Sequence, residues 1–280
     1  MPELPEVETV ARRLHENFIG RTVRSLWCNW PRMVDPGLRQ LRRDLPGRRV
    51  EAVGRRAKWI VWQLAPAGRL MLHLRMSGHP EVLPEGTTPA KHVHFVLAFD
   101  DGRAMHLDDA RKFARVLWSP ADDPLADLGM EPLSEAFTVE WLTRAMRRRS
   151  RRLKPALLDQ AFIAGLGNIY TDEALHRARL HPLRATDSLR RPEIERLRAA
   201  IRESLETGIR HNGASIDWVY PGGEMQDYFR AYGRTGSPCP ECGTPIRRMV
   251  VGQRGTHFCP ACQRAPRAEA SRPARRTGRG

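Results

Sequence analysis

Four of the five cysteines form two closely spaced pairs near the end of the chain. Cys239-Pro-Glu-Cys242 and Cys259-Pro-Ala-Cys262 are separated by 16 residues. Each pair can supply two thiolates from one tight turn, and two such turns close a tetrahedral site in which the protein provides all four ligands. Because no position remains for water or substrate, the spacing predicts one structural Zn²⁺ that shapes the fold without taking part in chemistry. We expect no organic cofactor.

The first six residues, Met1-Pro-Glu-Leu-Pro-Glu6, allow two interpretations. The simpler one is an initiator methionine followed by the start of a helix, and the sequence alone favours it. The second is chemical, because removal of Met1 would expose the secondary amine of Pro2 beside the carboxylate of Glu3. Such an amine can attack an aldehyde-like carbon and form an iminium while the acid transfers protons.

A glycine-containing turn, Gly165-Leu-Gly-Asn-Ile-Tyr170, joins two segments of helical pattern. Its glycines allow close backbone approach, and the amides at the start of the following helix can bind a phosphate, with Asn168 adding a side-chain donor. A Gly-x-Gly between helices is more often only a turn. The arginine run at 147–152 also suits phosphate, but it equally suits a solvated face.

The 280 residues carry 47 Lys and Arg against 32 Asp and Glu, a formal net charge of +15. The segment 264–280 holds six Arg and one Glu, so ten positive charges remain on the rest of the chain. This excess predicts a polyanionic partner, in the first place nucleic acid. No stretch approaches the run of about 20 apolar residues that a membrane helix needs, and no secretory signal opens the chain. We therefore expect a cytoplasmic protein with no membrane partner.

Short segments rich in apolar and β-branched residues make up most of the first 130 residues, at 58–64, 69–74, 94–99 and 116–118. Many short strands at this spacing need two faces to bury their apolar sides, which predicts a β-sandwich with a hairpin at Asp100-Asp-Gly102. A helix over 5–18 precedes the strands, since its apolar residues recur at helical spacing. Cys28 is expected in a buried strand.

From Phe137 onward the pattern turns helical, with segments at 138–147, 154–164, 168–179 and 192–208. The predicted fold class is therefore α+β in two lobes. We expect a β-sandwich domain over 1–130, a helical domain over 131–228 and a cysteine module over 229–263. The tail, 264–280, is too poor in apolar residues to pack and is expected to be disordered.

Taken together, these motifs resemble the bacterial formamidopyrimidine-DNA glycosylase family, repair enzymes that excise oxidised purines such as 8-oxoguanine and ring-opened formamidopyrimidines. The resemblance runs from residue 2 to about residue 263. It rests on motifs in the family's order: Pro2-Glu-Leu-Pro-Glu-Val-Glu8, Lys58, His73-Leu-Arg-Met-Ser-Gly78, Lys91-His-Val-His94, Arg111-Lys-Phe113, the 165–170 turn, Tyr232-Gly-Arg234, and the cysteine module with Gln253-Arg254.

The resemblance implies a catalytic β-sandwich followed by a helix-two-turn-helix domain and a zinc finger, with damaged double-stranded DNA in the cleft between the lobes. Pro2 would form a Schiff base with C1′ of the damaged nucleotide, and Glu3 would be its acid/base partner. Lys58 would act as an acid and phosphate ligand in β-elimination, and Arg254 would support δ-elimination. We expect a monomer associated with the bacterial nucleoid.

The same resemblance implies a set of DNA contacts. Met76, Arg111 and Phe113 would fill the gap left by the extruded nucleotide. The phosphate ligands would be His92, Arg149, Lys154 and Asn168. The physical reason is that a base stacked in a duplex cannot reach a nucleophile, so the nucleotide must be flipped out and its place filled.

The chain departs from the family's pattern near the proposed wedge. Arg75 stands where the family usually has Gly, and Ala110 and Ala114 replace the usual Pro and Gly. The segment 215–226, which matches the loop over the flipped base, looks short. Lesion preference is therefore left open.

Two alternatives remain. An endonuclease VIII-type enzyme would prefer oxidised pyrimidines but usually carries Gly where this chain has Leu4. A catalytically silent DNA-binding protein would not need Pro2, Glu3, Lys58 and Arg254 together.

Overall fold

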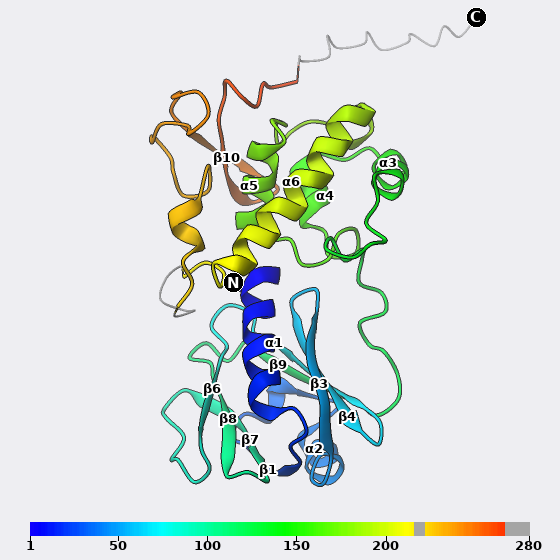
Figure 1. The fold of residues 1–280 in the computed structure, drawn as a ribbon, viewed down its shortest axis with the longest axis vertical. Helices are drawn as coiled ribbons and strands as arrows, with labels where there is room; N and C mark the ends of the chain where they lie inside the picture. Colours follow the sequence, from blue (N-terminus) through cyan, green and yellow to red (C-terminus); the bar gives the residue numbers. More distant parts are fainter. Residues whose placement is uncertain (216–221, 267–280) are drawn as a thin grey trace, which may run out of the picture.

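The computed structural model describes residues 1–215 and 222–266, and these residues form two lobes (Figure 1). The expectations for a disordered tail and for a short 215–226 loop fall largely on residues outside this description. One lobe is built mainly of strands, and the other of helices and a small hairpin, so the α+β prediction is confirmed. Within the described part of the chain, no helix is both long and apolar enough to cross a membrane.

The N-terminal lobe contains two sheets. The four-stranded sheet has the order β1-β7-β8-β6 and is antiparallel throughout. Its strands are β1 (Val23–Cys28), β6 (His79–Pro84), β7 (Val93–Phe99) and β8 (Arg103–Asp108). The β7–β8 hairpin turns at Asp100-Asp101-Gly102, as expected, and Gly102 supplies the positive φ of 78° in this turn.

The five-stranded sheet has the order β2-β9-β5-β4-β3, in which only the β2–β9 pair is parallel. Its strands are β2 (Val34–Asp35), β3 (Arg49–Arg56), β4 (Trp59–Ala65), β5 (Arg69–His73) and β9 (Arg115–Ser119). A one-turn helix, η1 (Pro31–Met33), and a short helix, α2 (Leu38–Asp44), lie between β1 and β3. Neither was expected from the sequence.

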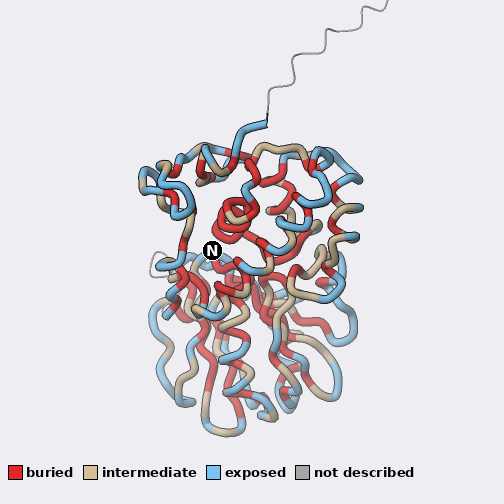
Figure 2. Tube along the Cα trace, turned by 45° about the horizontal axis from the view of Figure 1, so that its top comes forward, coloured by how far each residue is buried: buried red, intermediate tan, exposed pale blue. Residues whose placement is uncertain are grey.

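Both sheets bury their apolar faces in one core, which makes this lobe a sandwich. Helix α1 (Leu4–Phe18) also contributes to that core, where Phe18 stacks on Phe99 with ring centroids 4.1 Å apart. Trp62 lies 5.8 Å from both rings, so this aromatic cluster joins the helix to both sheets. Removing one such buried ring costs about 3–5 kcal/mol of stability. Figure 2 draws buried residues red, and in this lobe they alternate with intermediate and exposed residues along strands such as β3 and β4.

The first turn of α1 reaches the other lobe. Val7, Val10 and Leu14 belong to the sandwich core, whereas Leu4 is wholly buried in the core of the helical lobe. In Figure 1, α1 extends from the sandwich toward α6, and the N-terminus lies where the two lobes meet. The helix therefore carries Pro2 and Glu3 to the boundary between the lobes.

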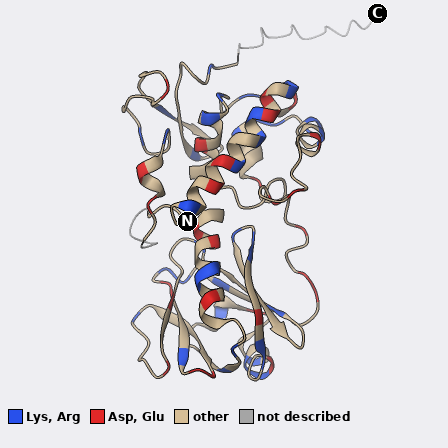
Figure 3. Ribbon diagram, in the orientation of Figure 1, with Lys and Arg blue, Asp and Glu red and all other residues tan. Residues whose placement is uncertain are grey.

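The C-terminal lobe consists of α3 (Val139–Arg147), α4 (Leu153–Leu158), α5 (Asn168–Arg177) and α6 (Arg191–Arg210), with short turns at η2 (Thr186–Ser188) and η3 (Met225–Tyr228). The predicted helix over 154–164 ends early, because Asp159 is extended and its carboxylate accepts the amide of Ala161. Acidic and basic residues alternate along α6 (Figure 3), where Arg191 pairs with Glu195 and Arg202 with Glu206.

A charged clasp fixes the chain that connects the lobes. The Glu131 carboxylate pairs with Arg55 at 2.9 Å and Arg56 at 3.1 Å and accepts the amide of Ala57 at 2.6 Å. Burial acts to raise the pKa of Glu131, but Arg55 and the hydrogen bonds hold it below its usual value. The clasp joins the β3–β4 turn, and with it Lys58, to the start of the helical lobe.

A two-stranded antiparallel hairpin, β10 (Arg247–Val251) and β11 (Arg254–Phe258), completes the cysteine module. Met130 and the helices after it share a core that is separate from the sandwich core, and Cys239, Ile246 and Cys259 form a third small cluster. The expected domain boundaries at 130/131 and 228/229 are compatible with these clusters and stay predictions.

Candidate active site and metal centre

A cavity of about 550 Å³ lies where the two lobes meet. The sandwich lobe contributes Pro2, Lys58, Met76 and Arg111, and the helical lobe and the hairpin contribute Asn168 and Arg254. Glu3 and Glu6 line its floor. The structure thus brings all four expected catalytic residues to one cavity, although they lie up to 252 positions apart in the sequence.

Glu3 is bound by the beginning of α5. Its carboxylate accepts the backbone amides of Gly167 at 2.8 Å, Ile169 at 2.9 Å and Tyr170 at 3.3 Å. The N-terminus of a helix is a natural site for an anion, because its first amides have no partner within the helix. The anion here is the carboxylate of Glu3. The suggested binding of phosphate by these amides is therefore not available while Glu3 holds them.

The glycines of the 165–170 turn are needed for this contact. A Cβ atom on Gly167 would lie 2.3 Å from Cδ of Glu3, and one on Gly165 would lie 2.7 Å from a methyl carbon of Leu4. Gly165 also adopts a φ of 99°. The motif forms a turn, as the simpler interpretation predicted. Its glycines allow the helical lobe to approach the first turn of α1 closely.

The surroundings of Glu3 shift the pKa of its carboxyl group. Burial raises the pKa of the Glu3 carboxyl above its usual value, and Glu6 raises it further, while the nearby Lys58 ammonium acts in the opposite direction. Burial also lowers the pKa of Lys58, although Glu3 and Glu6 oppose this effect. A carboxyl that protonates more readily beside an amine that deprotonates more readily is suited to proton transfer.

Glu6 is a site residue that sequence reasoning did not single out. One of its oxygens accepts the backbone amide of Glu3 at 2.7 Å, and the other accepts the Tyr170 hydroxyl at 2.7 Å and the Ala214 amide at 2.8 Å. Its signal in the sequence is its place three residues after Glu3, as in a capping box. Glu6 therefore orients the backbone on which Pro2 and Glu3 stand.

Lys58 occupies the second position of the two-residue β3–β4 turn, after Ala57. Ala57 has a positive φ of 53°, and its amide is held by Glu131. Lys58 itself is only 5% exposed although it lines the cavity. The turn thus directs a lysine side chain into the space beside Glu3, and the clasp described above fixes the turn.

The three expected gap-filling residues lie on two loops of the sandwich lobe. Met76 and Phe113 are 41% and 43% exposed, so both side chains are accessible to a ligand from solvent. The Arg111 guanidinium lies 4.8 Å from the centroid of the Phe113 ring. Arg75, beside Met76, has a positive φ of 54°, a conformation that Gly adopts with less strain.

The expected phosphate ligands differ in accessibility. Arg149 is exposed and His92 is half-buried, so both can meet a ligand from solvent. The side-chain amide of Asn168 donates to the carbonyl of Gly255 at 3.0 Å, while its oxygen is buried with no hydrogen-bond partner in the described chain.

Lys154 does not fit a direct phosphate contact, because its side chain is completely buried. Its ammonium lies 2.6 Å from an oxygen of Asp172 and donates to the carbonyl of Gly255 at 3.0 Å. The second oxygen of Asp172 accepts the amide of His257 at 2.8 Å. Lys154 therefore joins α4, α5 and β11, and it acts on the hairpin from inside the protein.

The four paired cysteines converge on one point. Their Sγ atoms all lie within 4.8 Å of one another, although the two pairs come from opposite sides of the β10–β11 hairpin. The amides of Glu241 and Cys262 donate to the sulfurs of Cys239 and Cys259, each at 3.4 Å, as expected for sulfurs that carry negative charge. This donor set fits a tetrahedral Zn²⁺ with no open position.

A histidine that the sequence analysis did not single out supports this centre. Nε2 of His176, in the last turn of α5, lies 3.2 Å from the sulfur of Cys239. Nδ1 of the same ring has no hydrogen-bond partner in the described chain, and the tautomer that carries its proton on Nε2 can donate it to the sulfur. No signal in the sequence connects two residues 63 positions apart.

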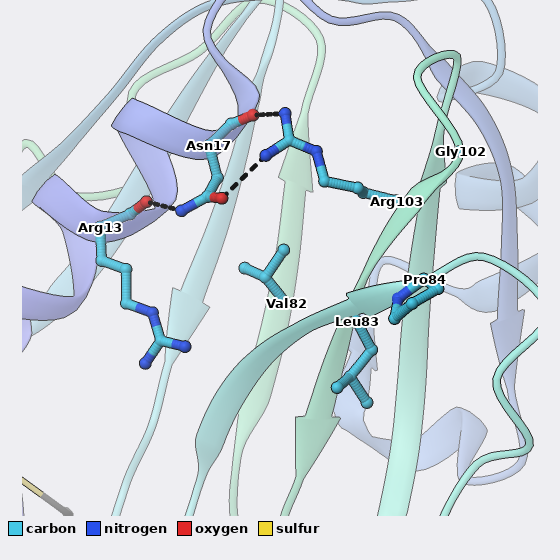
Figure 4. Close-up of a pocket in the computed structure, with 7 residues that line it drawn as sticks. All are labelled: Arg13, Asn17, Val82, Leu83, Pro84, Gly102 and Arg103. Atoms are coloured by element: carbon cyan, nitrogen blue, oxygen red, sulfur yellow. Dashed lines mark hydrogen bonds between the residues drawn. The ribbon is translucent and has the colours of Figure 1, made fainter.

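A second cavity, of about 480 Å³, lies on the sandwich lobe between α1 and the ends of β6 and β8 (Figure 4). Asn17 donates to the Arg13 carbonyl and accepts from Arg103, so its polar groups are satisfied within the protein (Figure 4). None of the expected site residues lines this cavity.

Comparison with protein families agrees with this arrangement. The family model of the formamidopyrimidine-DNA glycosylase N-terminal domain matches residues 1–116, and that of the H2TH domain of the same enzymes matches residues 128–219. A third family, described as the zinc finger found in FPG and IleRS, matches residues 236–265.

Individual relatives match over nearly the whole chain. The formamidopyrimidine-DNA glycosylase of Roseiflexus sp. (strain RS-1) is 48% identical over 94% of this chain and 100% of its own length, and that of Chloroflexus aggregans is 46% identical over 94% and 98%. A solved structure of Lactococcus lactis Fpg (MutM) with DNA containing N7-benzyl-Fapy-dG aligns with a TM-score of 0.89 at 36% identity, covering 94% of this chain and 100% of that one. A structure of MutM with DNA containing carbocyclic 8-oxo-G gives 0.88 at 37% identity with the same coverage.

The match of all three domains in order and the near-complete coverage lead to one conclusion. The chain belongs to the formamidopyrimidine-DNA glycosylase family, the base-excision repair enzymes that combine DNA glycosylase and AP lyase activity.

Proposed function

We propose that the protein removes 8-oxoguanine and formamidopyrimidines from double-stranded DNA by forming a Schiff base on Pro2 and cleaving the strand by β,δ-elimination. The observation that carries the mechanism is the position of Pro2. It lines the cavity between the lobes, next to Glu3, whose pKa is raised by burial. A nucleophilic amine beside a group that exchanges protons is the minimum that the reaction requires.

The first step needs a free secondary amine, so Met1 must be removed before the protein is active. The Pro2 nitrogen then forms a bond to C1′, and the bond between C1′ and the base breaks with its electron pair leaving on the base. A proton neutralises the departing base, and Glu3 manages the proton transfers that open the sugar to an iminium. Glu3 is suited to this task because the α5 amides fix its orientation.

The iminium makes the next bonds easier to break. Loss of a proton from C2′ expels the 3′ phosphate, and a second elimination expels the 5′ phosphate before water releases Pro2. Lys58 is proposed to act as an acid and phosphate ligand in the first elimination, since it lies beside Glu3 with a lowered pKa. Arg254 is proposed to support the second, since it is exposed, permanently charged and on the cavity wall.

DNA reaches this chemistry only if the damaged nucleotide leaves the duplex. Met76, Arg111 and Phe113 are proposed to enter the stack in its place, because they are exposed on loops beside the cavity. Arg149, His92 and Asn168 are proposed to hold phosphates. Lys154 is proposed to position the zinc hairpin from inside the protein. The solved relatives named above bind DNA with an oxidised or ring-opened purine, which supports the same substrate for this chain.

The remaining parts of the proposal concern the metal and the assembly. Cys239, Cys242, Cys259 and Cys262 are proposed to bind one Zn²⁺, which would hold the hairpin and Arg254 in place without supplying a catalytic group. We further propose that the protein works as a monomer in the cytoplasm, associated with the bacterial nucleoid.

Trapping with borohydride on duplexes that each hold one lesion tests the proposal. We expect a stable protein–DNA adduct with 8-oxoguanine and formamidopyrimidine substrates and none with undamaged DNA. Stronger trapping on an oxidised pyrimidine would support the endonuclease VIII-type alternative. Binding without an adduct on any lesion would support the non-catalytic alternative.

A further inference from the structure

Three loops of the sandwich lobe carry the proposed DNA contacts of that lobe. One holds Met76, the second holds His92, and the third holds Arg111 and Phe113. Met76 and Phe113 are exposed, so their own side chains cannot fix the loops by burial. Some other group must hold the loops in register if they are to enter a duplex together.

Asp109 contacts all three loops. One oxygen of its buried carboxylate accepts the hydroxyl of Ser77, the residue after Met76, and the other accepts the amide of Ala114, the residue after Phe113, at 2.6 Å. Its backbone amide donates to the carbonyl of His92 at 2.8 Å. Asp109 is the shared partner of three segments that are far apart in sequence.

The Asp109 carbonyl also shapes the third loop. It accepts the amide of Lys112 at 3.0 Å, and Lys112 adopts a positive φ of 56°. The Lys112 ammonium lies 4.5 Å from the centroid of the Trp30 ring, so this side chain has a partner in another segment of the lobe. The loop is therefore closed from Asp109 to Ala114 by two hydrogen bonds to one residue.

The neighbouring acid offers a natural comparison. Asp108 is the last residue of β8, only half-buried, and pairs through its backbone register with Val93 and His79. Its side chain has none of the loop hydrogen bonds that Asp109 makes in the described structure. Of these two adjacent aspartates, only Asp109 makes hydrogen bonds to the three loops.

We propose that Asp109 is a positioning residue that sets Met76, Arg111 and Phe113 in the geometry needed to replace the extruded nucleotide. This inference rests on the proposed function. A carboxylate suits the role because it only accepts hydrogen bonds and so matches two donors at once, and because bonds to a charged acceptor are stronger than neutral ones. Asp109 is completely buried and does not line the cavity, so it acts through the loops alone.

The test compares two substrates under single-turnover conditions: a duplex with 8-oxoguanine and the same duplex with a preformed abasic site. Asp109→Ala is expected to slow excision by about 10- to 100-fold, because misplacing a group by about 1 Å has an effect of this size. Cleavage at the abasic site should fall much less, since no base has to leave the stack. Asp109→Asn should retain more activity, because its oxygen can accept from Ala114 while its amide donates to Ser77. Asp108→Asn is the matched control and should behave like the wild type.

A second variant and a second readout keep the inference testable should Asp109→Ala fail to fold. Ser77→Ala removes one of the two hydrogen bonds to the Asp109 carboxylate, and the hydrogen bond from the Ala114 amide remains. It should weaken the fluorescence rise of 2-aminopurine placed beside the lesion, which reports unstacking. Equal losses on both substrates, or unchanged excision and fluorescence in Ser77→Ala, would overturn the inference. A wild type that excises no lesion and traps no adduct would instead overturn the proposed function, and this inference with it.

Discussion

Helix α5 serves a different site at each of its ends. At its beginning, the backbone amides of Gly167, Ile169 and Tyr170 hold the carboxylate of Glu3 beside an open cavity. At its end, the side chain of His176 approaches the sulfur of Cys239, one of four cysteine sulfurs that lie within 4.8 Å of one another. The same ten-residue helix thus borders the cavity proposed to admit substrate and the cysteine centre proposed to bind a metal ion without an open position.

The comparison shows how the two kinds of site are built. Backbone amides cannot change their charge, so they can hold Glu3 through the change of protonation that the proposed mechanism requires. Burial raises the pKa of Glu3 most, the Lys58 ammonium lowers it, and the Glu6 carboxylate raises it. The cysteine centre needs no such freedom, and its supporting groups serve only to orient and neutralise sulfur. Changes at the two ends of α5 should therefore have separable effects.

The largest separable effect is expected at the beginning of α5. Glu3→Gln keeps the size of the side chain but removes its ability to exchange a proton, so base excision should fall by about 10²- to 10⁴-fold. Zinc content should stay at the wild-type level. Glu8→Gln is the matched control, because Glu8 lies on the same helix and binds Arg12 and Arg55 outside the cavity. Single-turnover excision near the wild-type rate in Glu3→Gln would contradict this assignment.

The next effect is expected at the cysteine centre. Cys259→Ser should lose bound zinc and weaken DNA binding by about tenfold or more, equivalent to about 1.4 kcal/mol, because the hairpin that carries Arg254 is no longer held. Metal analysis and titration with labelled duplex would measure both. Cys28→Ser, at the end of β1 in the other lobe, should retain the metal. Full DNA affinity in zinc-free protein would show that the hairpin needs no metal.

A smaller effect is expected from the contact at the end of α5. His176→Phe fills the same space but cannot donate to Cys239, so zinc affinity should fall by about 10- to 100-fold, as for other partners of metal ligands. Competition with a chelator would measure it, and excision by the zinc-loaded variant should stay close to the wild type. His79→Phe, in the sandwich lobe, controls for the general effect of losing a histidine. If both variants retain zinc equally well, His176 does not support the cysteine centre.

The smallest effect concerns pH. If protonated Glu3 is the active form, excision declines as the pH rises through its raised pKa. Lys58 lowers that pKa, so Lys58→Met should raise it and move the decline to higher pH by about one unit, even though the maximal rate also falls. Single-turnover rates across the pH range would show the shift. A decline that stays in place or moves to lower pH would mean that Glu3 and Lys58 are not coupled in this way.

Local patterns in the sequence predicted the parts that depend on local physics. The spacing of Val7, Val10, Leu14 and Phe18 predicted α1, and the two Cys-x-x-Cys pairs predicted a site whose four sulfurs do converge. The strands and the hairpin at Asp100-Asp101-Gly102 were predicted for the same reason. Family resemblance supplied the order of the domains, which the matching family models confirm.

What the sequence did not reveal depends on partners far apart in the chain. Family resemblance implied that Lys154 is a phosphate ligand, and nothing local in the sequence shows that Asp172 and the Gly255 carbonyl enclose it. The difference between Asp108 and Asp109 arises only when three loops meet. Helix α2 was missed, since its short, arginine-rich sequence has only Leu41 wholly buried.

Mapping the reduced adduct to a single residue tests the central claim most directly. The protein would be trapped with borohydride on 8-oxoguanine duplex, digested, and analysed by mass spectrometry alongside its intact mass. The account predicts a protein that begins at Pro2 and a sugar remnant attached to the Pro2 nitrogen. Active protein that retains Met1, or an adduct carried by Lys58 while Pro2 is unmodified, would contradict it.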